Sequence, residues 1–246
     1  MALNYEEMTD EELFELVQQL REIDEDEDEA DEDNLEEAAK IVKLVADRGN
    51  VGALCDYGVY LMNGDGVEKD EAAAVACWEK AAEQNFAPAL YKLGVCCLQG
   101  VCGLPKDESK AADYFTKAAE QGNADSMLNL SVLYSNGMGV EADPQKSNTY
   151  LEMAAEEGQP VACCVIGATL TGKADPKDWE RGAKLLEQAA EAGNTEAQFF
   201  YGMCCEKARG VEQDLAKAAG WYRRAAKAGM PQANEALINL GFPGLF

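Results

Sequence analysis

The phrase EKAAEQN occupies residues 79–85, and related phrases follow as TKAAEQG at 116–122, EMAAEEG at 152–158, EQAAEAG at 187–193 and RRAAKAG at 223–229. The second alanine of the phrase returns every 35 to 37 residues, at Ala82, Ala119, Ala155, Ala190 and Ala226. A period of this length is typical of a solenoid, in which each copy is one supersecondary unit that stacks on its neighbours. The repeat therefore predicts an all-α fold.

Each copy contains two helical segments, called helix A and helix B in chain order. Helix A carries two columns of small residues five positions apart: Ala53, Ala89, Ser126, Ala162 and Ala197, then Gly58, Gly94, Ser131, Gly167 and Gly202. Helix B carries a bulky pair at a fixed position: Cys77–Trp78, Tyr114–Phe115, Tyr150–Leu151, Leu185–Leu186 and Trp221–Tyr222. Because small and large residues at matched heights interdigitate, the columns predict that helix A packs against helix B.

A glycine-containing loop joins helix A to helix B, and each loop ends on an aspartate. These aspartates are Asp70, Asp107, Asp143, Asp178 and Asp214, each eleven residues before the first alanine of the AA phrase. A constant distance from the helix predicts that the carboxylate accepts hydrogen bonds from the free amides of the first turn. We therefore interpret the aspartates as structural caps rather than ligands.

A helix with A-x-x-x-L-G, a G-x-G-V loop, an aspartate and K-A-A-x-x-G together resemble the Sel-one-like repeat, a relative of the tetratricopeptide repeat. The resemblance covers about residues 35 to 240: a leading helix B (Leu35–Gly49), five full repeats and a trailing helix A (Pro231–Leu240). It implies that residues 35–246 form a right-handed α/α superhelix, a scaffold or adaptor without catalytic residues. The fourth copy departs from the pattern, with TGKADPKD as its loop and DWERG at the start of helix B, which leaves its local loop path open.

Residue types also argue against catalysis. The chain has no histidine, the commonest general base and metal ligand. It also lacks a phosphate-binding loop, a nucleophile elbow and a dinucleotide fingerprint. We therefore expect no enzyme activity and no cofactor.

Nine cysteines include three adjacent pairs on helix A, Cys96–Cys97, Cys163–Cys164 and Cys204–Cys205. Because neighbours on a helix diverge by about 100°, we expect one member of each pair to face the core as a small apolar residue. A metal site in these pairs is the alternative, but no C-x-x-C motif or histidine completes a zinc ligand set. We therefore expect no metal.

Acidic residues are concentrated at the N-terminus. Residues 1–37 carry 18 acidic residues and one arginine, and the whole chain has a net charge of −25. Residues 22–33 hold ten acids in twelve positions, which predicts a solvated, disordered linker. The charge disfavours nucleic acid and anionic membrane and favours a basic protein partner. No signal peptide or apolar run of about 18 residues is seen, so we expect a cytoplasmic protein.

Residues 1–34 are predicted to form a separate N-terminal segment. Thr9 and Glu12 form a capping box, followed by an apolar stripe of Leu13, Leu16, Val17 and Leu20 with Phe14 at its edge. Two interpretations of this amphipathic helix stay open. It covers the exposed apolar end of the first repeat, or it docks into the groove of a partner or of a second copy.

Solenoids of this class usually bind partners on the concave face lined by helix A. The variable row on that face is Asp56, Lys92, Asn129, Val165 and Phe200, and the row one turn further on ends with Met203. We predict a groove with a polar N-terminal half and an apolar C-terminal half around Val165, Phe200 and Met203. The alternative is that these residues pack between helices.

The C-terminal phrase GFPGLF at 241–246 is too apolar to be left in water without a reason. It is expected either to seal the last repeat or to insert into the groove of a neighbouring molecule.

The sequence thus favours a non-catalytic scaffold that binds a protein or peptide. The alternative is an acidic, stoichiometric inhibitor or immunity-type protein that neutralises a basic target.

Overall fold

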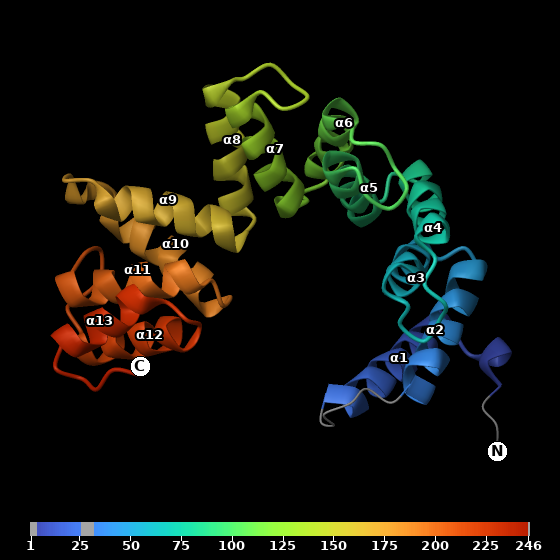
Figure 1. The fold of residues 1–246 in the computed structure, drawn as a ribbon, viewed down its shortest axis with the longest axis horizontal. Helices are drawn as coiled ribbons and strands as arrows, with labels where there is room; N and C mark the ends of the chain where they lie inside the picture. Colours follow the sequence, from blue (N-terminus) through green and yellow to red (C-terminus); the bar gives the residue numbers. More distant parts are fainter. Residues whose placement is uncertain (1–3, 26–31, 246) are drawn as a thin grey trace. The chain divides into compact units, whose positions relative to one another are not determined.

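The computed structural model describes residues 4–25 and 32–245, with side chains for residues 4–21 and 32–245 (Figure 1). These residues form helices and connecting loops, without a β-strand. The α-helices are α1 (Asp10–Glu25), α2 (Glu32–Asp47), α3 (Val51–Asn63), α4 (Glu71–Glu83), α5 (Ala87–Gln99), α6 (Glu108–Ala119), α7 (Ala124–Asn136), α8 (Pro144–Glu156), α9 (Pro160–Gly172), α10 (Trp179–Glu191), α11 (Thr195–Lys207), α12 (Leu215–Lys227) and α13 (Pro231–Asn239). Short 3-10 helices at Tyr5–Glu7 (η1) and Pro176–Asp178 (η2) precede α1 and α10. The predicted all-α fold is confirmed.

The helices group into two compact units. Unit 1 comprises the residues up to 123 together with 138–141, and unit 2 comprises 124–137 and the residues from 142 onward. Within unit 1, α3 packs on α4 and α5 on α6; within unit 2, α7 packs on α8, α9 on α10 and α11 on α12. Each A helix thus pairs with the B helix of its own repeat, as predicted. Among the described residues, no helix is both long and apolar enough to cross a bilayer.

The small column of helix A meets the bulky column of helix B. A Cβ atom added to Gly94 would lie 2.6 Å from Phe115 Cε1, and one added to Gly202 would lie 2.7 Å from Tyr222 Cε1. Both rings are fully buried. The third repeat has serine in place of glycine, and there the hydroxyl of Ser131 lies 3.3 Å from that of Ser147. A small residue of helix A thus lies against a large side chain of helix B in the second and fifth repeats, as predicted, whereas two serine hydroxyls meet in the third.

A second set of glycines brings the A–B loop against the preceding repeat. Gly66 has φ +62° and Gly210 has φ +74°, in the left-handed region. A Cβ on Gly66 would lie 2.1 Å from the carbonyl oxygen of Leu35, and one on Gly210 would lie 2.1 Å from that of Trp179. The backbone conformation and the missing space both require glycine. These loops therefore pack on the first turn of a helix B one repeat earlier.

Four of the five loop aspartates cap helix B through their side chains. The carboxylate oxygens accept amide hydrogen bonds from Ala73 to Asp70 (2.9 Å), Lys110 to Asp107 (2.9 Å), Lys146 to Asp143 (3.0 Å) and Lys217 to Asp214 (2.8 Å). Asp178 is the exception, and its prediction as a side-chain cap is wrong. The turn η2 precedes α10 there, so Asp175 accepts from the Lys177 amide (3.1 Å) and Asp178 pairs with Lys173 (3.6 Å).

This difference predicts unequal effects for two identical substitutions. Asp214→Ala removes a bonded cap and is expected to lower the free energy of unfolding by about 1 kcal/mol. Asp178→Ala removes only an exposed ion pair, so the expected change is within about 0.5 kcal/mol. Urea denaturation of both variants, followed by circular dichroism, measures the difference. Equal losses would contradict the assignment of the caps.

The N-terminal helix α1 folds back on the first helix of the repeat array. The amide of Thr9 donates to the Glu12 carboxylate (2.8 Å), which confirms the capping box. Leu13 and Val17 are buried in one cluster with residues of α2, and the Arg48 guanidinium donates to the carbonyl oxygens of Tyr5 (2.9 Å) and Met8 (2.8 Å). Packing on the first repeat is thus the arrangement found, in place of an unoccupied docking helix.

The acidic run is more helical than expected. The helix α1 continues to Glu25, and α2 begins at Glu32, three residues before the predicted start at Leu35. The rest of the expected linker, residues 26–31, lies outside the described residues.

The C-terminal tail bonds to α13 but leaves apolar side chains exposed. The Phe242 amide donates to the Leu237 carbonyl (3.0 Å), and the Leu245 amide donates to Asn234 Oδ1 (2.6 Å). Ile238, Phe242 and Leu245 nevertheless remain partly exposed. The tail therefore covers the last helix only in part, and Phe246 lies outside the described residues.

Candidate protein-interaction surface

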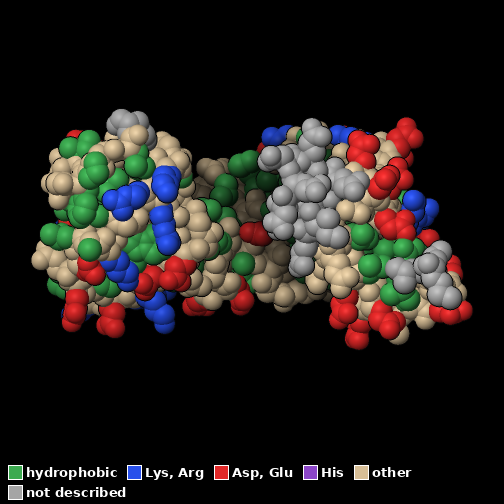
Figure 2. Space-filling model, turned by 90° about the horizontal axis from the view of Figure 1, so that it is seen from below, with side chains coloured by type: hydrophobic (Ala, Val, Ile, Leu, Met, Phe, Trp, Pro, Cys, Tyr) green, Lys and Arg blue, Asp and Glu red, His purple; other side chains and the backbone are tan. Residues whose placement is uncertain are grey.

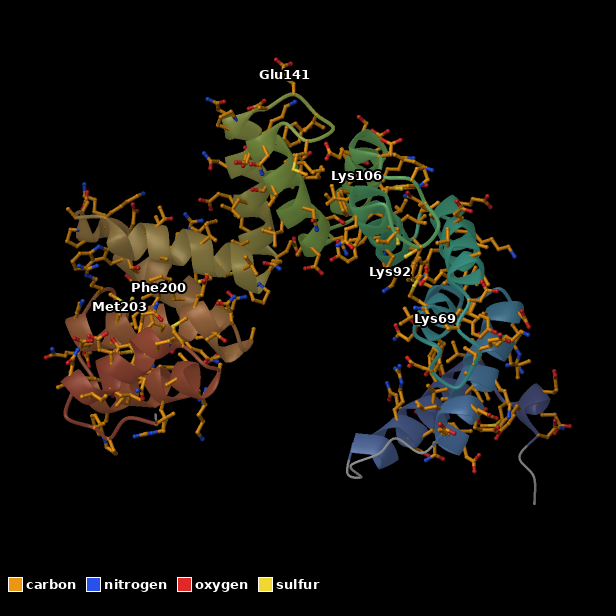
Figure 3. The ribbon with its side chains drawn as sticks, viewed as in Figure 1. Lys69, Lys92, Lys106, Glu141, Phe200 and Met203 are labelled. Atoms are coloured by element: carbon orange, nitrogen blue, oxygen red, sulfur yellow. The ribbon has the colours of Figure 1, made fainter. Side chains whose placement is uncertain are left out.

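The predicted row lies on the A helices of both units. Figure 3 labels three of its members, Lys92, Phe200 and Met203. Unit 1 holds Asp56 on α3 and Lys92 on α5; unit 2 holds Asn129 on α7, Val165 on α9, and Phe200 and Met203 on α11. The structure thus divides the row into a charged pair in unit 1 and a less polar group in unit 2.

The unit 1 part of the row is charged. The surrounding protein raises the pKa of the Asp56 carboxyl by desolvation, although its side chain reaches the surface; the charges of Arg21 and Lys92 act in the opposite direction. The ammonium group of Lys92 lies 5.7 Å from the centroid of the Trp78 ring, within the range of a cation–π contact. This part of the row therefore carries one charge of each sign.

A surface pocket of about 340 Å³ adjoins Asp56 in unit 1. Its lining comes from α1, α2 and α3: Phe14, Val17, Gln18, Arg21, Val42, Asp56, Val59 and Tyr60. The repeat pattern did not predict that α1 contributes side chains to this pocket, because α1 lies outside the repeat. Arg21 adds a positive charge to the lining of this pocket, and its guanidinium carbon lies 5.2 Å from the centroid of the Tyr60 ring.

Three of the four predicted residues in unit 2 are partly engaged. Asn129 Nδ2 donates to the carbonyl oxygen of Asp125 in its own helix (2.8 Å). Phe200 and Met203 are half-buried, and the Phe200 ring contacts the Phe199 ring with centroids 5.7 Å apart. Contacts within α7 and α11 thus engage part of what the sequence assigned to a groove.

Val165 is different, because it belongs to an exposed stripe on a helix without a charged residue. The sequence of α9 is PVACCVIGATLTG, which contains no lysine, arginine, aspartate or glutamate. Val161 and Val165 are each 45% exposed, and Thr169 is exposed one turn further on. We call these three residues the α9 stripe; their four-residue spacing places them on one face of the helix.

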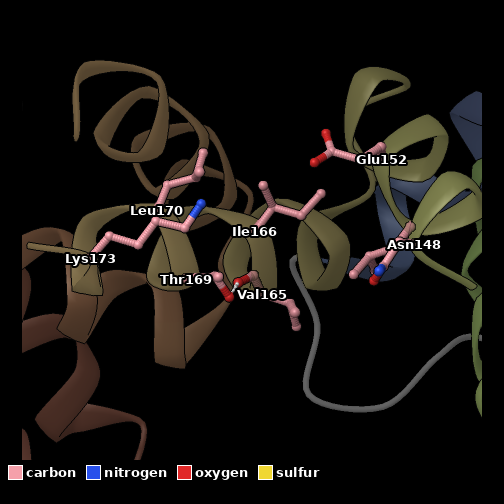
Figure 4. Close-up of a pocket in the computed structure, with 8 residues that line it drawn as sticks. Asn148, Glu152, Val165, Ile166, Thr169, Leu170 and Lys173 are labelled. Carbon is pink, nitrogen blue, oxygen red and sulfur yellow. Dashed lines mark hydrogen bonds between the residues drawn. The ribbon is translucent and has the colours of Figure 1, made fainter. Parts of the chain in front are cut away.

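A shallow pocket of about 260 Å³ lies beside the α9 stripe (Figure 4). Helix α8, helix α9 and the residue after α9 line it with Asn148, Leu151, Glu152, Val165, Ile166, Thr169, Leu170 and Lys173. The charged groups at its edge already have partners: Glu152 with Arg181, and Lys173 with Asp178. The lining is thus mixed, with four apolar residues, two uncharged polar residues and one charged residue of each sign.

Charge elsewhere on the surface is mainly negative, as the net charge of −25 requires. In the view of Figure 2, acidic side chains are exposed on both units, with apolar side chains between the charged ones. A basic or neutral partner approaches such a surface with less repulsion than an acidic one.

Both members of each adjacent cysteine pair are buried, which corrects the expectation that only one would face the core. Exposure is 4% or less for all six thiols: Cys96, Cys97, Cys163, Cys164, Cys204 and Cys205. The A helices have packed neighbours on more than one side, so two directions about 100° apart are both covered. Burial raises the pKa of Cys164 and of Cys204 to about 11. Across the described residues, no group of three or more His, Cys, Asp or Glu side chains is placed to hold a metal ion.

A comparison with protein-family models identifies the repeat. The Sel1 repeat model matches five consecutive segments of the chain, 51–86, 87–123, 124–159, 160–194 and 195–230. These segments follow the helix pairs from α3 onward, with the N-terminal helices α1 and α2 before the first.

Among proteins of known name, DAP3-binding cell death enhancer 1 of Mus musculus is 36% identical over 173 residues, which are 70% of this chain and 34% of that protein. The chain thus spans about a third of the length of this relative. Among solved structures, a Sel1 repeat protein from Oxalobacter formigenes is 31% identical, with a TM-score of 0.75 over 84% of this chain and 60% of that one. The immunity protein Pa5087 from Pseudomonas aeruginosa matches at a TM-score of 0.59, over 92% of this chain and 87% of that one; at 18% identity this likeness shows the fold alone.

Proposed function

Because this chain belongs to the Sel1 repeat family, we propose that it is a non-catalytic scaffold or adaptor that binds a protein or peptide partner. The observation that carries the proposal is the α9 stripe beside the pocket lined by α8 and α9 in unit 2. Contiguous exposed apolar surface on a soluble protein marks a contact site. A helix with no charged residue and two valines at 45% exposure is such a surface.

The geometry suits an apolar side chain of the partner. A volume of about 260 Å³ holds one or two side chains of a peptide rather than a large cofactor. Glu152, paired with Arg181, and Lys173, paired with Asp178, also line the pocket, where charges fix a partner's orientation more than they add affinity. The name of the mouse relative, which says that it binds DAP3, supports a protein as the class of partner.

The test is a charge placed in the stripe. Val165→Glu puts a carboxylate where the partner's apolar side chain would be desolvated, and we expect partner capture from native lysate to fall at least about tenfold. Since Val165 is 45% exposed, the free energy of unfolding should change by less than about 1 kcal/mol. Quantitative mass spectrometry of the captured proteins gives the ratio.

A matched control is Leu215→Glu in the same unit. Leu215 is 47% exposed, at the first position of α12, where a carboxylate also suits the helix dipole. Proteins retained by this variant and by the unaltered chain but lost with Val165→Glu are the specific partners. Equal retention by all three proteins would contradict binding at the stripe.

A second candidate function is the acidic inhibitor of a basic target, favoured by the 18 acidic residues among the first 37. Its complex would form quickly at low salt and weaken steeply as salt screens the charges. A partner released by 0.5 M salt and indifferent to Val165→Glu would favour this candidate over the scaffold. The same negative charge disfavours nucleic acid and anionic membrane as ligands.

A further inference from the structure

Three sulfur atoms lie together at one end of the first two A helices in unit 1. Cys96 Sγ is 3.3 Å from Cys102 Sγ, and Cys102 Sγ is 3.8 Å from Met62 Sδ. Met62 comes from the last turn of α3, Cys96 from the last turn of α5, and Cys102 from the loop that follows α5. This sulfur cluster (Met62, Cys96 and Cys102) therefore joins two successive repeats.

The backbone of Cys102 has an unusual conformation. Its φ is +59°, a left-handed conformation that a residue with a Cβ seldom adopts. In this conformation the loop holds the Cys102 side chain against the apolar cluster around Leu93 and Trp78. Cys96 is 4% exposed, whereas Met62 and Cys102 are half-buried, so access from solvent is on the loop side.

We propose that the sulfur cluster binds a soft monovalent metal ion, Cu(I) or its analogue Ag(I), through two thiolates and one thioether. Cysteine and methionine sulfur are the ligands that select such an ion, and the cluster contains no carboxylate, imidazole or water-rich shell for a hard cation. Sulfur ligands about 2.3 Å from a metal in a trigonal plane are about 4 Å apart. The Cys96–Cys102 and Cys102–Met62 sulfur separations need to widen by less than about 1 Å to reach that arrangement.

Charge balance fits the same ion. Two thiolates and one monovalent cation leave a net charge of −1, and Lys92 carries a positive charge one turn before Cys96 on α5. Because the thiolate is the form of cysteine that ligates a metal, binding of the ion displaces thiol protons, and affinity is expected to rise with pH.

The test is anaerobic titration of the reduced, full-length chain with Cu(I) against the chromophoric chelator bicinchoninate. The unaltered chain is expected to take one equivalent away from the chelator. Cys102→Ser should abolish this uptake, and Met62→Leu, which keeps the volume but removes one soft ligand, should weaken it by on the order of tenfold. Circular dichroism checks that each variant remains folded.

The control is Cys77→Ser, which removes another half-buried thiol while the cluster stays intact, and it should bind as the unaltered chain does. X-ray absorption of the loaded protein should show three sulfur neighbours around copper. Uptake unchanged by Cys102→Ser, or lost equally with Cys77→Ser, would overturn the proposal. Absence of uptake together with an oxidised Cys96–Cys102 disulfide by mass spectrometry would also overturn it.

Discussion

Replacing Gly210 with alanine is expected to lower the free energy of unfolding by roughly 3 kcal/mol. Two costs combine at this position. The backbone has φ +74°, which disfavours any residue with a Cβ, and the new Cβ would lie 2.1 Å from the carbonyl oxygen of Trp179. That oxygen belongs to the backbone of α10, so neither side can move without disturbing the contact between repeats. Urea denaturation monitored by circular dichroism measures the loss.

Gly220→Ala is the matched control for Gly210→Ala. Gly220 lies within α12 in the same unit, and an added Cβ there meets no atom within 4 Å. Because alanine is the better helix former, we expect this variant to gain about 0.5–1 kcal/mol. If Gly210→Ala proved as stable as Gly220→Ala, the loop would not be the contact between repeats that the structure describes.

The second large effect is expected at Leu13, the fully buried residue of the N-terminal helix. Leu13→Ala leaves a cavity between α1 and α2 and should lower the free energy of unfolding by about 2–5 kcal/mol. Gln19→Ala is the control on the exposed face of the same helix, with an expected change within about 0.5 kcal/mol. Thermal unfolding of the full-length variants compares the two.

This comparison separates the two interpretations of α1. A helix that packs permanently on the first repeat contributes to its stability, whereas a docking helix would be free in the unbound protein. A Leu13→Ala variant with unaltered stability and reduced partner capture would favour docking.

Much of the fold followed from periodicity, because the features involved are local. The fixed distance between each loop aspartate and the AA phrase predicted four side-chain caps correctly. Asp178 also directly precedes its helix, but it ends η2 with a helical backbone (φ −95°, ψ −6°) instead of the extended one, and its side chain makes no cap hydrogen bond. The match between Gly202 and Tyr222 was likewise readable from position within the repeat. Because the geometry of a helix is regular, the spacing of residues in the sequence predicts which of them occupy matching positions on neighbouring helices.

What escaped prediction depends on contacts between repeats. The packing of Gly210 on Trp179 joins a loop to a helix of the repeat before it, and nothing in either segment alone indicates this. The sulfur cluster brings together Met62 and Cys102, which are 40 positions apart. The contribution of Arg21 to the pocket beside Asp56 comes from a helix outside the repeat pattern. Such proximity arises from the stacking of repeats. The period predicts that the repeats stack, but not which of their residues come into contact.

The candidate site was only partly predictable for a related reason. Position within the repeat identified Val165 together with Phe200 and Met203, but not how far each is covered by its neighbours. Val165 lies on a helix with no charged residue and is 45% exposed, whereas Phe200 and Met203 are half-buried. The degree of exposure decides which member of the row is available to a partner.

The measurement that tests the proposed function most directly is site-specific photo-crosslinking in native lysate. A photoreactive amino acid is placed at position 161, 165 or 215 of the full-length chain, and the crosslinked products are identified by mass spectrometry. Binding at the α9 stripe predicts the same protein or peptide partner at positions 161 and 165, and its absence at position 215. Crosslinks that are absent from both stripe positions, or equally abundant at position 215, would contradict the proposal.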